Sequence, residues 1–222
     1  MCGKFTQLVK WEDMLPFAQA LEAMPENAPA TIATPMRFAK VMRLDEAGRR
    51  ELVSMRWGFS KHGAASPAPD HMHARGETID SKPRFCDAFG ERRGILLVET
   101  FNEGEQQPSG RTKQWTIRPK DRKPIAIAVI WEEWRSQSGA VELTFIQATV
   151  PANALVSRIT DRMPAILRQE DWPAWLGERD APLREIKALL RTFEDDGNWQ
   201  MGEQNASKAT KTPPPKAQMD LF

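Results

Sequence analysis

The chain has 222 residues and a formal net charge of +1, from 31 Lys+Arg against 30 Asp+Glu, so any nucleic-acid contact must come from a local basic patch. Its longest apolar runs, 95–98 and 125–131, are far shorter than the roughly 20 residues that cross a bilayer. Two cysteines, Cys2 and Cys86, give neither a disulfide framework nor a metal-ligand spacing, and we therefore expect a cytoplasmic protein without membrane segment, metal or other cofactor.

The first predicted element is a helix, because Met14, Phe17, Leu21 and Met24 recur with helical spacing and Pro16 limits where it begins. Six β-rich runs separated by Gly, Pro, Asp and Ser then follow at 38–44, 51–59, 94–101, 113–119, 124–131 and 141–150. This order predicts an α+β protein built on a curved, mostly antiparallel sheet.

Two late helices are predicted at 170–176 and 181–193. Pro182 suits the first turn of the second helix, and Leu183, Ile186, Leu190 and Phe193 share one of its faces. From 202 to 216 the composition becomes polar and includes a Pro triplet, which is typical of disorder. We therefore expect one domain over 1–200 and a disordered tail over 201–222.

Cys2 directly follows the initiator methionine in the opening stretch MCGKFTQ. If Met1 is removed, an α-amino group and a thiol share one residue, and such an aminothiol condenses with an aldehyde to a five-membered thiazolidine. From position alone, however, Cys2 is better explained as a small residue that permits Met1 removal and packs in the core. Cys86 is interpreted as a small buried residue or an idle thiol.

Six segments occur in one order: MCGKFT at the start, MRWGF at 55–59, HARGETIDSKPRFCDAF at 73–89, RRGILLVETFNEG at 92–104, ATVPAN at 148–153 and ITDRMPAIL at 159–167. Together they resemble the SRAP family of SOS response-associated peptidase proteins, which crosslink to abasic sites in single-stranded DNA. The resemblance covers roughly residues 1–195. It implies a SRAP-like fold with a barrel-like core and flanking helices.

The resemblance also implies the chemistry. Met1 would be removed autocatalytically, and Cys2 would form the thiazolidine with the ring-opened deoxyribose aldehyde. Glu103 in TFNEG matches the glutamate of a GFYEW-like motif, where a carboxyl shuttles protons during ring opening and imine formation. Without the resemblance, Glu103 would be interpreted as a solvated acid at a strand end.

Two positions depart from the family pattern. His73 replaces the asparagine of the family's NARxET motif, and Thr160 replaces the histidine of its HDRMP motif. Thr160 cannot titrate near neutral pH, whereas His73 either supplies an imidazole from another side or is a polar surface residue. We therefore expect crosslinking to survive and release to be slowed.

The resemblance assigns DNA contact to Arg75 and Arg162, and Lys4 stands where the family has arginine. Lysine and arginine both neutralise phosphate, but only the guanidinium of arginine binds two oxygens at once. The alternative for the arginines is an internal ion pair with Glu77 or Asp161.

The chain also offers aromatic candidates for DNA contact. Trp57 and Phe59 can offer a stacking face for a base, or pack in the core.

The last five residues, Gln218, Met219, Asp220, Leu221 and Phe222, resemble the bacterial sliding-clamp-binding peptide. In such a peptide two apolar anchors enter a pocket while the glutamine fixes orientation. The alternative is a terminus that packs back on its own domain.

The leading hypothesis is a monomeric, nucleoid-associated enzyme that crosslinks abasic single-stranded DNA and uses the clamp as a second partner. The alternative is a module that still binds single-stranded DNA and the clamp but has lost efficient chemistry, as Thr160, His73 and Gly104 would allow. A free-standing cysteine peptidase is a weaker third hypothesis, because beyond His73 no partner set accompanies Cys2.

Overall fold

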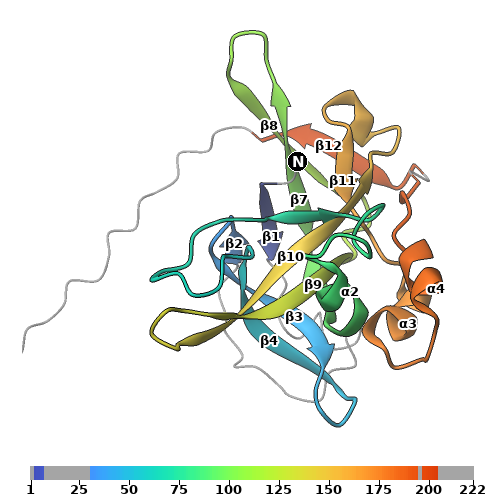
Figure 1. Ribbon diagram of the computed structural model, residues 1–222. Helices are drawn as coiled ribbons and strands as arrows, with labels where there is room; N and C mark the ends of the chain where they lie inside the picture. Colours follow the sequence, from blue (N-terminus) through green and yellow to red (C-terminus); the bar gives the residue numbers. More distant parts are fainter. Residues whose placement is uncertain (1–2, 8–30, 195–196, 205–222) are drawn as a thin grey trace, which may run out of the picture.

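A computed structural model describes residues 3–7, 31–194 and 197–204, which form two β-sheets with short helices beside them (Figure 1). The strands are β1 (Lys4–Gln7), β2 (Thr31–Ala33), β3 (Phe38–Leu44), β4 (Arg50–Trp57), β5 (His73–Arg75), β6 (Arg93–Val98), β7 (Thr100–Gln106), β8 (Thr112–Pro119), β9 (Ile125–Arg135), β10 (Val141–Pro151), β11 (Arg162–Pro164) and β12 (Trp199–Glu203). The helices are α2 (Cys86–Glu91), α3 (Trp172–Leu176) and α4 (Leu183–Ala188), with 3₁₀ turns η1 (Val156–Arg158) and η2 (Gln169–Asp171).

The larger sheet contains a closed barrel. Its order runs β10-β4-β3-β6-β9, and β9 pairs again with β10, so five strands form a ring to which β5 and β11 are added. Only the pairings of β10 with β4 and β5 are parallel. The interior is filled by side chains that alternate along these strands, and it includes the fully buried Val41, Met55, Leu96, Ile127 and Phe145.

The smaller sheet has the order β12-β8-β7-β1-β2 and is antiparallel throughout. It packs on the barrel through Phe5, whose ring centroid lies 4.9 Å from that of Trp57. The side-chain amide of Gln7 donates hydrogen bonds of 3.0 Å to the carbonyls of Lys40 and Leu97, which ties β1 to the barrel. The expected α+β fold with a mostly antiparallel, barrel-like core is confirmed.

Most predicted strands are present, and three had wrong limits. The run 124–131 was too short, because β9 continues to Arg135. The run 94–101 is not one strand: β6 belongs to the barrel and β7 to the smaller sheet, with a bend at Glu99 between them. The run 51–59 ends at Trp57, because Gly58 has φ of +121°, which a strand residue does not adopt. Glycine is required at this position, since a Cβ would lie 2.3 Å from Met72 Cε.

The helix predicted at 170–176 is confirmed as η2 followed by α3, whereas the helix predicted at 181–193 was too long, since α4 ends at Ala188. After α4, tertiary hydrogen bonds replace helical ones. Thr192 Oγ1 donates to the Pro151 carbonyl, and Asn153 Nδ2 donates to the Phe193 carbonyl, both at 2.9 Å. The helix predicted around 14–24 lies outside the described residues.

The predicted domain boundary after residue 200 was too early, because β12 continues to Glu203 and pairs with β8 over its whole length. Gly202 and Glu203 are therefore part of the smaller sheet and not of a tail. Residues 205–222, including the clamp-like segment 218–222, lie outside the described residues. Across the described ranges, no helix is long and apolar enough to cross a membrane.

Candidate active site

The register of β1 brings the start of the chain to Glu103. Lys4 faces Asn102 and Phe5 faces Phe101 across the antiparallel pair β1–β7, so the next residues outward are Gly3 and Glu103. Facing residues in such a ladder have Cβ atoms about 4.5–5.5 Å apart. Gly3 directly follows Cys2, which itself lies outside the described residues. Glu103 is therefore placed at the point where the chain enters the sheet.

The Glu103 side chain is buried, with 1% of its surface exposed, on the same face of β7 as Phe101. Burial raises its pKa to about 7; the positive charge of the amino terminus acts against this rise, and the negative charge of Asp161 adds to it. A carboxyl with a pKa near 7 both accepts and donates protons at neutral pH, which suits general acid–base catalysis.

Thr160 lies in the segment between η1 and β11, directly before Asp161. Thr160 is half-buried in the turn after η1, and its backbone N–H donates a 3.1 Å hydrogen bond to the Val156 carbonyl. The next residue, Asp161, raises the pKa of the Glu103 carboxyl through its negative charge. The role predicted for Thr160 stays a prediction.

His73 lies in β5 and faces Gln147 across the parallel pair β5–β10. Its half-buried imidazole stands edge-on to the Trp57 ring, with centroids 5.9 Å apart and an interplanar angle of 84°. Trp57 in turn contacts Phe5, so aromatic contacts link His73 to the strand that begins beside Glu103. This position is compatible with the imidazole hypothesis, which stays a prediction.

Arg162 forms the internal ion pair that the sequence left open. Its two terminal nitrogens lie 2.5 and 2.8 Å from the carboxylate oxygens of Glu77, and Nη2 also donates to the Thr149 carbonyl at 2.7 Å. The hydrogen bond from Arg162 holds the pKa of Glu77 below its usual range. Arg162 thus has the internal ion pair, whereas the Arg75 side chain is exposed. DNA contact by either arginine stays a prediction.

Three other predicted DNA contacts are placed away from the Glu103 face or beneath the surface. Lys4 is half-buried, and because side chains alternate along β1, it points to the face opposite Phe5 and Glu103. The stacking role of Trp57 and Phe59 was wrong, since both rings are 0% exposed. Core packing explains them instead: Trp57 lies between Phe5 and Phe145.

Cys86 is half-buried at the start of α2, with its Sγ 3.5 Å from Asp87 Oδ1. It lies in a helix beside the barrel, and Glu103 lies in the smaller sheet. Among the side chains that the structure describes, no group of three His, Cys, Asp or Glu residues is arranged to hold a metal ion.

Sequence reasoning missed two residues near the site. Trp115 is half-buried and faces Glu103 across the pair β7–β8. The turn signal Pro-Ser-Gly at 108–110 offered a way to find it, because counting outward from that turn pairs 103 with 115. Gln147 is 0% exposed, and within the described residues neither polar atom of its side chain has a hydrogen-bond partner. A single glutamine in an apolar run gives no such signal.

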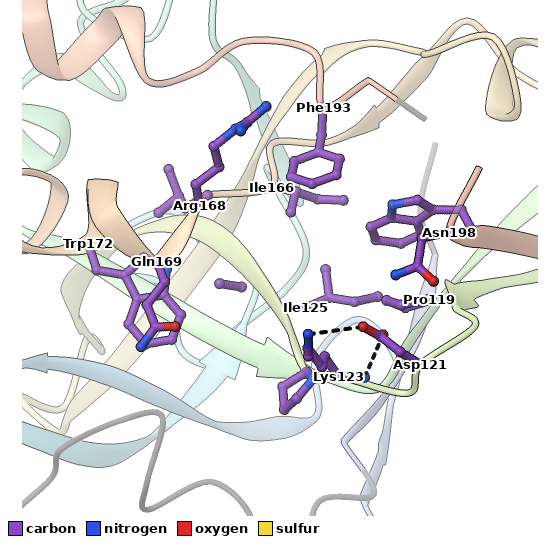
Figure 2. A pocket seen from close by; sticks show the side chains of 14 residues that line it. Pro119, Asp121, Lys123, Ile125, Ile166, Arg168, Gln169, Trp172, Phe193 and Asn198 are labelled. Carbon is purple, nitrogen blue, oxygen red and sulfur yellow. Dashed lines mark hydrogen bonds and ion pairs between the residues drawn. The ribbon is translucent and has the colours of Figure 1, made fainter. Parts of the chain in front are cut away.

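A separate pocket of about 280 Å³ lies between the start of β9 and the segment that follows α4 (Figure 2). Figure 2 shows Ile125, Ile166 and Phe193 around it, with Lys123 paired to Asp121 at 3.2 Å on its rim. None of the site residues predicted from the sequence lines it, so it is distinct from the Glu103 site.

Comparison with known proteins gives a family match and curated relatives. The model of the family described as SOS response associated peptidase (SRAP) matches residues 1–206. A Bacillus subtilis protein named abasic site processing protein YobE is 26% identical over 200 residues, which cover 88% of this chain and 91% of YobE. Chicken abasic site processing protein HMCES is 27% identical over 175 residues, which cover 68% of this chain and 52% of HMCES.

Solved structures share the fold. A crystal structure of a Bordetella bronchiseptica protein superposes with a TM-score of 0.75 at 20% identity, over 92% of this chain and 100% of that one. A Bacteroides thetaiotaomicron protein superposes with a TM-score of 0.76, also at 20% identity, over 92% of this chain and 93% of the other.

Proposed function

The chain belongs to the SOS response associated peptidase family, and from that premise we propose that it processes abasic sites in single-stranded DNA by attaching Cys2 to them. Relatives of B. subtilis and chicken carry the name abasic site processing protein, which supports the choice of substrate. The observation that carries the proposal is the position of the buried Glu103 beside Gly3, the neighbour of Cys2.

The proposed reaction begins with removal of Met1 by hydrolysis, which frees the amino group of Cys2. That amine adds to the C1′ aldehyde of the ring-opened deoxyribose, and loss of one water leaves an imine. The Cys2 sulfur then adds to the imine carbon while its proton passes to the nitrogen, which closes the thiazolidine. The aldehyde and the aminothiol thus become one ring plus water, with no change in oxidation state.

Glu103 serves this reaction as the acid–base group. Its carboxylate takes a proton from the attacking amine, and its acid form returns a proton to the oxygen that leaves as water. A pKa near 7 keeps both forms populated at neutral pH, which an exposed glutamate with the usual pKa of 4.5 would not do.

Exposed Arg75 holds the DNA backbone by neutralising phosphate. Lys4 is a second cation near the chain start, on the face of the smaller sheet opposite Glu103. His73 and Thr160 flank the reacting sugar in this proposal. Thr160 has no group that titrates near neutral pH, so reversal of the crosslink is slow.

The test is a denaturing gel with a single-stranded oligonucleotide that carries one abasic site. The proposal predicts a covalent band that Cys2→Ala abolishes and that Cys86→Ala, the matched cysteine control, leaves intact. A band that survives in Cys2→Ala, or that disappears in Cys86→Ala alone, contradicts the proposal.

The alternative is a module that binds abasic single-stranded DNA without efficient chemistry. Thr160 favours it, because a hydroxyl that does not titrate near neutral pH stands where the family pattern has a histidine. Binding of the oligonucleotide in a native gel without a covalent band in the denaturing gel would support this alternative.

We also propose that Gln218–Phe222 binds the bacterial sliding clamp, with Leu221 and Phe222 as apolar anchors. Tethering to the clamp would raise the local concentration of the domain at replicating DNA. A pull-down with purified clamp, using the full chain and a chain without 218–222, tests this. Equal retention of the two chains would refute it.

A further inference from the structure

Trp115 shares the face of the smaller sheet on which Glu103 lies. The two residues are direct partners in the antiparallel pair β7–β8, so their side chains leave the sheet on the same side with Cβ atoms about 4.5–5.5 Å apart. The β7–β8 hairpin projects from the end of the molecule where β1 begins (Figure 1). A nucleotide next to a sugar held at Glu103 therefore comes within reach of the Trp115 ring.

The Trp115 ring is held in a fixed plane before any ligand arrives. Its indole N–H donates a 2.8 Å hydrogen bond to Glu105 Oε2, and the ring is half-buried against the core. An aromatic ring fixed in this way loses little conformational entropy when a base stacks on it. Such rings are the usual stacking platforms of single-strand binding proteins.

One face of the ring is covered by a cation that can move. Lys113 Nζ lies 4.5 Å from the Trp115 centroid and 3.0 Å from Glu203 Oε2. The Lys113 and Glu203 side chains are 33% and 52% exposed, and ion pairs this exposed hold their partners weakly. Stacking of a base changes affinity by about 10-fold or more, which exceeds the effect of an exposed cation–π contact, so stacking can displace the ammonium.

The two aromatic candidates predicted from the sequence are unavailable. Trp57 and Phe59 are completely buried. Gly104, the residue after Glu103, carries no ring, and any side chain there would place its Cβ 2.6 Å from Thr112 Cγ2. Within the described residues this leaves Trp115 as the partly accessible ring that the register sets directly against Glu103.

We infer that Trp115 stacks against the nucleobase next to the abasic sugar and that the displaced Lys113 neutralises the adjoining phosphate. This inference deepens the proposed function and rests on it for the identity of the substrate. Trp115 fixes the position of the strand and takes no part in the proton transfers assigned to Glu103.

The test uses a single-stranded oligonucleotide with a tetrahydrofuran abasic analogue and 2-aminopurine on its 5′ or 3′ side. The analogue has no aldehyde, so the assay measures binding alone. We expect the wild-type protein to quench 2-aminopurine on at least one side, and Trp115→Leu to lose that quenching and about 10-fold in affinity. Trp115→Phe keeps a ring and should recover most of the affinity.

Trp131→Leu is the matched control. Trp131 is also half-buried, with the Arg43 guanidinium 4.5 Å from its centroid, but it lies near the β3–β4 hairpin at the other end of the molecule (Figure 1). Quenching retained in Trp115→Leu, or lost equally in Trp131→Leu, would overturn the inference.

Lys113→Gln gives a readout that does not depend on how the ring substitutions fold. Loss of one phosphate contact lowers the slope of log affinity against log salt by about 0.7 for a single strand, and an unchanged slope contradicts the inference. Failure of the wild-type protein to crosslink natural abasic DNA would instead refute the proposed chemistry and leave these binding results to be judged by themselves.

Discussion

Arg162 and Glu77 form a two-point ion pair that ties β11 to the turn after β5, with nitrogen–oxygen distances of 2.5 and 2.8 Å. The Arg162 side chain is 11% exposed and the Glu77 side chain 48% exposed. The pair therefore fixes the strand after Thr160 and Asp161 relative to the strand that carries His73 and Arg75.

Glu77→Ala should destabilise the fold by about 1–2 kcal/mol, below the range for fully buried pairs because Glu77 is half exposed. Glu133→Ala is the matched control: Glu133 is also 48% exposed and pairs with Arg135 at 2.6 Å, but Arg135 is 63% exposed. We expect less than about 0.5 kcal/mol there by denaturant unfolding. Equal losses of unfolding free energy in the two variants would show that the Arg162–Glu77 pair stabilises the fold no more than an exposed pair.

Glu103 should make stability fall as pH rises. The folded state holds the Glu103 proton up to about pH 7, whereas the unfolded chain releases it near 4.5, so the folded state binds more protons between these values. Wild-type stability should drop by up to about 3 kcal/mol relative to Glu103→Gln between pH 5 and pH 8. The control is Glu170→Gln, at an exposed position. If the unfolding free energies of wild type and Glu103→Gln changed with pH in parallel, the raised pKa of Glu103 would be contradicted.

The same titration should appear in the chemistry. The ionised Glu103 carboxylate is the form that accepts the proton of the attacking amine, so the crosslinking rate should rise as pH passes through about 7. Glu103→Gln should lower the rate by about 100-fold and remove this rise. A pH profile of the same shape in the variant would exclude Glu103 as the acid–base group.

Thr160→His should speed release of the crosslink while leaving its formation largely unchanged, because an imidazole beside Asp161 can carry protons near neutral pH. Ser157→His places the same side chain on the exposed surface of η1 and should change neither rate. Crosslink yield and its reversal after addition of competing aldehyde measure the two effects. No change in either rate would remove the reason to assign Thr160 a role.

Gln147→Leu should stabilise the protein by about 1–2 kcal/mol in thermal or denaturant unfolding. Gln147 is fully buried, and both polar atoms of its side chain lack a hydrogen-bond partner in the described part of the chain. An unsatisfied buried amide carries a desolvation cost of about 1–3 kcal/mol, which leucine of similar volume avoids. A destabilised variant would show that the amide has a partner in solution.

The sequence predicted those parts of the fold that depend on local pattern. The bounds of β3 match the run 38–44, because turn residues mark both of its ends and most of its side chains are apolar. The split of 94–101 at Glu99 was invisible, since an apolar run looks the same whether it stays in one sheet or crosses to another. The end of α4 at Ala188 depends on hydrogen bonds to Pro151 and Asn153, which no local pattern encodes.

The candidate site was predictable only in part. The position of Glu103 follows from its motif, and the β1–β7 register adds its neighbour Gly3. The sequence alone could not decide between DNA contact and internal contacts for Arg162 and Trp57. Arg162 pairs with Glu77, 85 residues away in the chain, and Trp57 packs against Phe5 of another strand. Pairing across the hairpin then identifies Trp115, which no motif contains.

The most direct test of the central claim is peptide mapping by mass spectrometry after the protein reacts with an abasic oligonucleotide and the DNA is digested. We predict a first peptide that begins at Cys2, without Met1, and carries the sugar with the loss of one water at its aminothiol. A first peptide that retains Met1, or an adduct mapped to Cys86 or to a lysine in place of Cys2, would contradict the account.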